Sequence, residues 1–180
     1  NLTNMKIVIL GAGRIGGSLA RNLSSSNYEV CIVDENKNKL SELEDKLDIM
    51  TVEGSASHIN TLKRSGLDEN TIILAVTSND EVNIVACQIA KREFNVRKTI
   101  CRFKDNSYFE KLDIFGEGII DIPISPEDEI TSHLKELINH PGAGQIESFA
   151  NGKVKLVSVK AKKKGKLVGR ELKGIKDDMP

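Results

Sequence analysis

The sequence predicts an α/β fold, a doubly wound parallel sheet with the strand order 3-2-1-4-5-6, and three observations carry this prediction. Short apolar runs rich in β-branched residues alternate with amphipathic helical segments. A glycine-rich turn follows the first apolar run, and an acidic residue ends the second. Such alternation is typical of a parallel sheet with helices on both faces.

Residues 6–34 form the first unit of this pattern. Residues 6–10 (KIVIL) show no polar alternation, which predicts a strand buried on both faces. The next segment is predicted to be a helix by apolar residues at four-residue spacing, namely Ile15, Leu19 and Leu23. A second strand, residues 30–33, ends in Asp34. This order of elements is that of a dinucleotide-binding βαβ unit.

The glycine-rich turn between strand and helix is residues 11–16 (GAGRIG). Gly11 permits a tight turn, Gly13 lets the backbone approach a pyrophosphate, and Gly16 allows close packing of helix on strand. Phosphates would lie against N–H groups at the positive end of the helix dipole. The alternative is a glycine turn that binds nothing. The turn lacks the Gly-Lys-Ser/Thr ending of a P-loop, which disfavours phosphate-bond hydrolysis by that kind of site.

Asp34 follows the glycines by about twenty residues, where a carboxylate can accept hydrogen bonds from both hydroxyls of an adenosine ribose. The same carboxylate would repel a 2′-phosphate. The pattern therefore predicts NAD, NADH or a plain adenine nucleotide as the ligand, and disfavours NADP.

The composition of the 180-residue chain restricts its partners. Lys+Arg and Asp+Glu each total 26, so the formal net charge is zero and the chain has no general attraction to nucleic acid or anionic lipid. No apolar stretch is long enough to cross a bilayer, no secretory signal is recognisable, and Met5 is a candidate for the natural start. Cys31, Cys87 and Cys101 form no Cys-x-x-Cys pair, so we expect these cysteines to be core residues of a reduced, cytosolic protein. The histidines have no metal-ligand spacing.

The first half of the sheet ends with a helix over residues 40–47 and a third strand over residues 49–52. Gly54, Ser55 and Ala56 follow at the carboxyl end of that strand, where this architecture places ligand-contacting loops. Small residues there would let an adenine ring approach. An ordinary strand-to-helix turn explains them equally well.

The second half begins with a short helix that ends near Gly66, with Ile59 and Leu62 expected to face inward. The fourth strand, residues 71–76, leads into the loop of residues 77–80, which should face the glycine turn where the strand order reverses. Thr77 and Ser78 are candidate donors to a phosphate or ribose. Alternatively, Ser78 or Asn79 only caps the next helix.

That next helix carries an apolar stripe that we interpret as core: Val82, Val85, Ala86, Ile89 and Ala90. The fifth strand, residues 99–102, ends in Arg102, and Lys104 follows. A cation at this end of a central strand points toward the ligand crevice, where Arg102 can pair with a terminal phosphate. The alternative is an ordinary surface arginine.

The remaining elements are less regular. We expect a short helix over residues 106–112, a sixth strand over residues 118–122, and a helix that begins at Ser125 and Pro126 with an apolar stripe needing a partner. Later segments are a break at residues 140–144, a strand over residues 153–161 with a bulge at Val157, a basic turn at residues 162–165 and a helix start at residues 167–172. These last elements are too few to close a core.

Several segments together resemble the RCK (also called KTN) domain family of potassium-transport regulators. They are residues 5–13 (MKIVILGAG), 75–81 (AVTSNDE), 85–88 (VACQ), 140–143 (HPGA) and 166–169 (KLVG). The resemblance implies a Rossmann-like nucleotide-binding subdomain over residues 5–123, a crossover or dimerisation helix and hinge over residues 124–150, and the incomplete start of a small α+β C-terminal subdomain over residues 151–180. It covers only the first half of proteins that carry two such units in tandem.

The resemblance also implies roles for individual residues. The diphosphate would lie against the turn from Gly11 through Ile15, that is Gly11, Ala12, Gly13, Arg14 and Ile15. Asp34 would hold the adenosine ribose, Thr77 and Ser78 the far side of the ligand, and Arg102 its phosphate or distal ribose. Family members bind NAD(H), ATP or ADP, and Arg14, often glutamine in related sequences, leaves this preference open. Glu127 matches a glutamate that helps to bind a divalent cation in some relatives.

The function that the resemblance implies is a non-catalytic nucleotide sensor. Family members form rings of paired domains in the cytoplasm, at the inner face of the membrane, and gate a potassium-transporting membrane subunit. One alternative is a fragment of an NAD-dependent dehydrogenase. Such an enzyme needs a proton donor beside the nicotinamide, and the only histidines after Pro123 are His133 and His140. Another alternative is an oligomerising scaffold with a vestigial nucleotide site.

Overall fold

A computed structural model describes residues 5–26, 28–109, 111–126, 131, 143–149 and 154–159. The chain divides into two compact units, Asn1–Pro126 and Glu127–Pro180. Each unit is described by itself below.

The first unit is built on a six-stranded sheet in which all pairs are parallel and the order is β3-β2-β1-β4-β5-β6. The strands are β1 (Lys6–Leu10), β2 (Glu29–Asp34), β3 (Met50–Glu53), β4 (Thr71–Ala75), β5 (Lys98–Arg102) and β6 (Ile122–Ile124). This confirms the predicted doubly wound order. The strand order reverses between β1 and β4, so the ends of these two strands form the switch point of the sheet.

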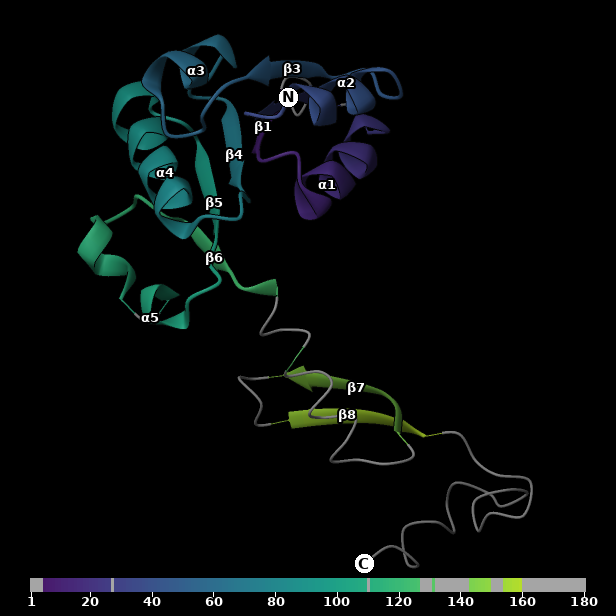
Figure 1. Ribbon diagram of the computed structural model, residues 1–180. Coiled ribbons are helices and arrows are strands. Elements are labelled where there is room, and N and C mark those ends of the chain that lie inside the picture. Colours follow the sequence, from purple (N-terminus) through teal and green to yellow (C-terminus); the bar gives the residue numbers. More distant parts are fainter. Residues whose placement is uncertain are drawn as a thin grey trace, which may run out of the picture. The chain divides into compact units, whose positions relative to one another are not determined.

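Helices cover both faces of the sheet (Figure 1). They are α1 (Arg14–Ser24), α2 (Lys37–Glu44), α3 (Ile59–Arg64), α4 (Asp80–Phe94), α5 (Asn106–Phe109) and a 3₁₀ helix, η1 (Leu112–Phe115). One apolar cluster packs α1 and α2 against Ile7, Ile9, Val30 and Ile32. The other packs α3 and α4 against Val8, Leu10, Ile73 and Cys101. Alternate residues of β1 therefore serve both clusters, as expected for a strand buried on both faces.

Two expectations about apolar residues need correction. Ile59 is 52% exposed, whereas Leu62 is fully buried as predicted. Val85 is 39% exposed, because the buried face of α4 is centred on Asn83 and Cys87, whereas Ala86 and Ala90 are buried as predicted. All three cysteines are buried with free thiols, which confirms them as core residues, and burial raises the pKa of Cys31 to about 11.

The region between β5 and β6 also differs from expectation. The helix predicted over residues 106–112 is split into α5 and η1. The sixth strand begins at Ile122, four residues later than predicted, because Gly116 and Gly118 have positive φ values of +105° and +69° and form a turn. Ile119 is buried within that turn.

In the second unit, the structure describes an antiparallel hairpin of β7 (Ala143–Phe149) and β8 (Val154–Val159). Strand β7 was not predicted. The register shift lies between Ala143 and Gln145 on β7, so the bulge expected at Val157 on β8 was placed on the wrong strand.

Several predictions fall outside the described residues: most of the helix from Ser125, the break before Ala143, the segment after Val159, and Glu127. Within the described part of the chain, no helix is both long enough and apolar enough to cross a membrane.

Candidate functional site

The glycine turn joins β1 to α1 at the switch point. Gly11 has a φ of +103°, and its N–H donates to the carbonyl of Val33 at 2.7 Å. A Cβ atom at Gly11 would lie 3.0 Å from the Cα of Thr77, and one at Gly16 would collide with the Gly11 carbonyl oxygen. Two of the three motif glycines are thus required by backbone conformation or close packing.

Helix α1 begins without a side-chain cap. Its N-cap residue is Gly13, no side chain bonds to its first N–H groups, and its first turn holds no acidic residue. A Cβ atom at Gly13 would have no atom within 4 Å, so the approach to the helix start is open there. By contrast, Asn36 caps α2 and Asn79 caps α4 with their side chains. The start of α1 therefore fits an external acceptor such as a phosphate.

Asp34 ends β2 next to the glycine turn, as predicted. Its Oδ2 accepts a hydrogen bond from the N–H of Ala12 at 2.6 Å, and its Oδ1 accepts one from the N–H of Asn36 at 2.8 Å. Lys39 Nζ lies 4.0 Å from Oδ1. Each carboxylate oxygen has two lone pairs, so Asp34 can still accept hydrogen bonds from the ribose hydroxyls. The bond to Ala12, 22 residues away, was not foreseen and ties the two parts of the motif together.

The turn after β3 has a structural explanation. Gly54 has a φ of +152°, and its N–H donates to the Asp34 carbonyl at 3.0 Å. A Cβ atom at this position would lie 2.6 Å from Thr61 Oγ1 on α3. The hydroxyl groups of Ser55 and Ser57 are 3.1 Å apart. These features describe a strand-to-helix turn, and the contact of Gly54 and Ser55 with a ligand stays a prediction.

The loop after β4 lies directly beside the glycine turn. The N–H of Val76 donates to the carbonyl of Leu10 at 3.0 Å. Asn79 caps α4, with its Oδ1 accepting from the N–H of Val82 at 2.8 Å, and Ser78 is exposed. The hydroxyl of Thr77 lies within hydrogen-bond distance of Asn83 Oδ1, at 2.7 Å, and of the Asn79 carbonyl, at 3.1 Å. The roles of Thr77 and Ser78 toward a ligand stay predictions.

Arg102 is 7% exposed, so the alternative of an ordinary surface arginine is wrong. Its Nη1 donates to the Thr77 carbonyl at 3.1 Å. The guanidinium therefore lies at the ends of β4 and β5, beside the loop that contacts the glycine turn. Its role as a ligand contact stays a prediction.

Two polar residues of α4 that sequence reasoning missed hold these loops together. Asn83 is fully buried and bonds to both Thr77 and Arg102. Asp80 is 7% exposed, and its carboxylate accepts from the N–H groups of Lys104 and Asp105 at 2.9 Å each. The available signal was their helical spacing with Cys87 and Ala90, which places all four on the buried face.

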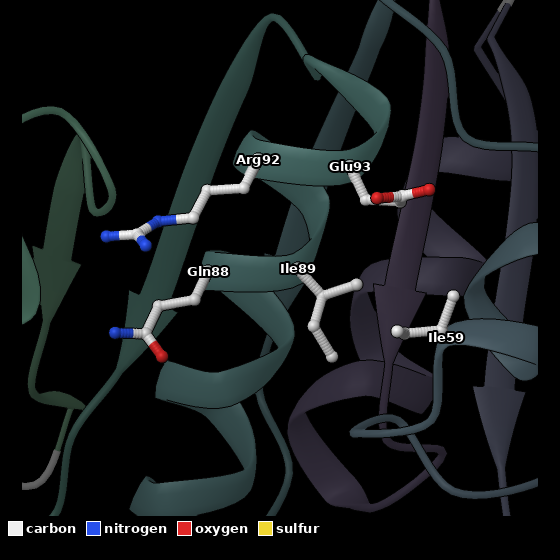
Figure 2. A pocket seen from close by; sticks show the side chains of 5 residues that line it. All are labelled: Ile59, Gln88, Ile89, Arg92 and Glu93. Atoms are coloured by element: carbon white, nitrogen blue, oxygen red, sulfur yellow. The ribbon is translucent and has the colours of Figure 1, made fainter.

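A groove of about 230 Å³ lies elsewhere, between α3 and α4, and is lined by Ile59, Gln88, Ile89, Arg92 and Glu93 (Figure 2). Ile89 and Glu93 extend toward Ile59, whereas Gln88 and Arg92 extend from another side of α4. None of the predicted site residues lines this groove. In the described residues no cluster of His, Cys, Asp or Glu is suited to a metal ion.

The comparisons with known proteins agree with this arrangement. The TrkA-N domain family model matches residues 7–126. The chain is 44% identical over 179 residues to the Trk system potassium uptake protein TrkA of Vibrio alginolyticus, an alignment covering 98% of this chain and 39% of that protein. It is 42% identical over 178 residues to the TrkA protein of Halomonas elongata, with the same coverage. The chain thus spans about two fifths of the length of these relatives.

Solved structures show the same fold. The TrkA-N domain of the inner membrane protein ybaL from Escherichia coli has a TM-score of 0.65 at 18% identity, covering 74% of this chain and 96% of that one. The GsuK channel bound to NAD has a TM-score of 0.63 at 23% identity, covering 80% of this chain and 25% of that one. These identities show the fold alone. The family model, together with relatives above 40% identity over nearly the whole chain, shows that the chain belongs to the TrkA-N domain family.

Proposed function

We propose that this chain binds an adenine nucleotide, NAD(H) or ATP/ADP, and serves as the nucleotide-sensing part of a regulatory subunit for potassium uptake, with no chemical step. The observation that carries the proposal is the uncapped start of α1, open at Gly13 and adjacent to the Asp34 carboxylate. The names of the relatives support potassium uptake. Structural neighbours that contain NAD or ADP support a nucleotide as the ligand.

The nucleotide would lie across the switch point. The N–H groups at Gly13, Arg14 and Ile15 would bind the diphosphate, since the Ala12 N–H already donates to Asp34. Asp34 would accept the ribose hydroxyls with its remaining lone pairs. The other end of the ligand would extend toward Thr77, whose backbone lies next to Gly11, and toward Arg102, whose Nη1 donates to the Thr77 carbonyl.

Sensing requires that nucleotides of different charge favour different conformations. ATP carries a γ-phosphate that ADP lacks, and the cations of Arg102 and Lys104 near the far end of the proposed site offer a partner for it. We propose that the response is a rigid-body change between paired copies of the domain, passed to a potassium-transporting membrane subunit. For this role the protein would act in the cytoplasm, at the inner face of the membrane.

The direct test is calorimetric titration of the chain with ATP, ADP and NADH, combined with solution scattering of each complex. We expect binding of at least one nucleotide, and Asp34→Ala should weaken it by about 1–3 kcal/mol through loss of hydrogen bonds to the ribose. Asp45→Ala is the matched control, because Asp45 is an exposed acidic residue at the end of α2 and the change in charge is the same.

Three outcomes would contradict parts of the proposal. Absence of binding by all three nucleotides would leave a scaffold with a vestigial site. Equal affinities with identical scattering curves would remove the sensing role but keep the binding role. Turnover of NADH with small carbonyl compounds, or of NAD with alcohols and hydroxy acids, would indicate a dehydrogenase, since a sensor transfers no hydride.

A further inference from the structure

Asn83 lies on α4 with no solvent exposure, between the two loops at the ends of β4 and β5. Its Oδ1 accepts hydrogen bonds from the N–H of Thr77 at 3.0 Å and from the Thr77 hydroxyl at 2.7 Å. Its Nδ2 donates to the Thr77 carbonyl at 3.3 Å and to the Arg102 carbonyl at 3.0 Å. A primary amide has two acceptor sites and two donors, so all four are used.

This one side chain fixes Thr77 through its N–H, its carbonyl and its hydroxyl, and fixes the end of β5 through the Arg102 carbonyl. The Arg102 guanidinium adds a further bond to the same Thr77 carbonyl, at 3.1 Å. Thr77 in turn packs against Gly11, where an added Cβ would lie 3.0 Å from its Cα. The amide of Asn83 therefore determines how Thr77 and Arg102 stand relative to the glycine turn.

A second buried tie, at Thr99, lies away from the switch point and offers a comparison. Thr99, near the start of β5, is also fully buried, and its hydroxyl donates to the Ile119 carbonyl at 2.7 Å and accepts from the Asp121 N–H at 3.1 Å. That tie joins β5 to the turn before β6 at the opposite end of the strand from Arg102. Both ties hold the fold, but only that of Asn83 contacts predicted ligand residues.

We propose that Asn83 is a positioning residue for nucleotide binding: it holds Thr77 and Arg102 in place for the part of the nucleotide beyond the adenosine and its first phosphate. This inference rests on the proposed function. It separates the site into an adenosine part at Asp34 and α1, which Asn83 does not contact, and a distal part that depends on Asn83.

The test compares the affinities of two ligands, AMP and NADH, for the 180-residue chain. AMP ends at the first phosphate, whereas NADH extends beyond it. We expect Asn83→Ala to reduce NADH affinity about tenfold or more, as loss of a buried hydrogen-bond network does. AMP affinity should stay within about twofold. A loss of fold alone lowers the affinity of both ligands together, so the ratio is the informative quantity.

Two further variants control for stability. Asn83→Asp keeps the size of the side chain and the Oδ1 acceptor, but it turns a second acceptor toward the carbonyls of Thr77 and Arg102. It should therefore show the same selective loss of NADH affinity. This variant replaces Asn83→Ala in the test if Asn83→Ala does not fold. Thr99→Val removes the tie at the other end of β5. It should lower the melting temperature in a thermal scan and leave the NADH-to-AMP affinity ratio unchanged.

The inference is overturned if the Asn83 variants lower both affinities equally, lower neither, or match Thr99→Val in the ratio. Failure of the proposed function gives a different result. In that case the unmodified chain itself binds neither AMP nor NADH.

Discussion

The two sides of the switch point are built in contrasting ways. The glycine side, defined as residues 11–16 with Asp34, is shaped by backbone conformation and close packing, and its helix starts without a side-chain cap. The asparagine side, defined as residues 77–83 with residues 102–105, is held by buried side chains that bond to backbone groups. Each of its loops is bonded to α4.

The difference suits the two sides to different tasks, phosphate binding on the glycine side and the positioning of loop residues on the asparagine side. A phosphate needs N–H groups that nothing else satisfies, and under the proposed function the side-chain-uncapped start of α1 would supply them. Groups that reach a ligand from a loop need a fixed position, and buried amide or carboxylate groups provide it. Asp34 would combine the two under the proposed function, since it accepts from the Ala12 N–H and has further acceptor sites that a ribose could use.

Gly16→Ala should break the glycine side with the largest effect. The new Cβ would collide with the Gly11 carbonyl oxygen, and backbone cannot move aside as a flexible side chain can. We expect the free energy of unfolding to fall by about 3 kcal/mol, the upper part of the usual range for overpacking. Chemical denaturation followed by circular dichroism measures it.

The control for this prediction is Gly17→Ala, one residue further along α1. A Cβ there would lie 3.7 Å from the nearest atom, an ordinary contact. Alanine is the better helix former, so this variant should gain about 0.5–1 kcal/mol. A similar loss in both variants would show that α1 rejects any added side chain and that Gly16 has no special role.

The same contrast explains what the sequence could predict. The glycine turn, Asp34 and the strands β1 to β5 are local patterns, and local periodicity predicts such elements well. Residues 118–121 were wrongly assigned to the sixth strand because Ile119, Ile120 and Ile122 resemble an apolar strand, although the conformations of Gly116 and Gly118 make the segment before Ile122 a turn.

On the asparagine side, the roles of Asn83 and Asp80 were missed because their partners are distant in the chain. Asn83 bonds to Arg102, 19 residues away, and Asp80 bonds to the N–H of Lys104, 24 residues away. A polar residue on a helix is ordinarily assigned to the exposed face, and the helical spacing of these two with Cys87 and Ala90 was the one local signal that they face inward. The position of the buried Arg102 was predicted from its place at a strand end, but its bond to Thr77 was not.

Acid titration tests the carboxylate of Asp121, which belongs to neither the glycine side nor the asparagine side of the switch point. Asp121 bonds to the Thr99 N–H at 2.7 Å and pairs with Lys91 Nζ at 2.8 Å. Burial alone would raise the pKa of Asp121, but the bonds from Lys91 and Thr99 outweigh it and lower the pKa below the usual 3.8. The carboxylate therefore stabilises the fold above pH 3.8, and this contribution is lost as the pH falls through the folded-state pKa.

We accordingly expect Asp121→Asn to be less stable than the unmodified chain by about 1 kcal/mol near neutral pH, as for a partly exposed ion pair. The difference should shrink below pH 3.8, as measured by urea denaturation across a pH series. Nucleotide affinity at neutral pH should not change. A stability difference that is constant down to pH 2 would show that the charge of Asp121 contributes nothing.

The smallest expected change in stability is also the sharpest test of the open helix start. Gly13→Ser supplies the N-cap acceptor that α1 lacks, in a position where an added Cβ meets no atom within 4 Å. Serine exceeds glycine as an N-cap by a few tenths of a kcal/mol, so the chain should become slightly more stable. Gly13→Ala is the control, since it adds the same Cβ without an acceptor.

The serine hydroxyl would accept from the N–H of Ile15 or Gly16, and the N–H of Ile15 is one of the groups proposed to bind the diphosphate. Calorimetric affinity for ADP should therefore fall more in Gly13→Ser than in Gly13→Ala, although the serine variant is the more stable of the two. If both variants bind ADP as the unmodified chain does, the phosphates do not lie at the start of α1. The absence of a cap there would then have no functional meaning, and the contrast with the capped start of α4 would be one of local stability alone.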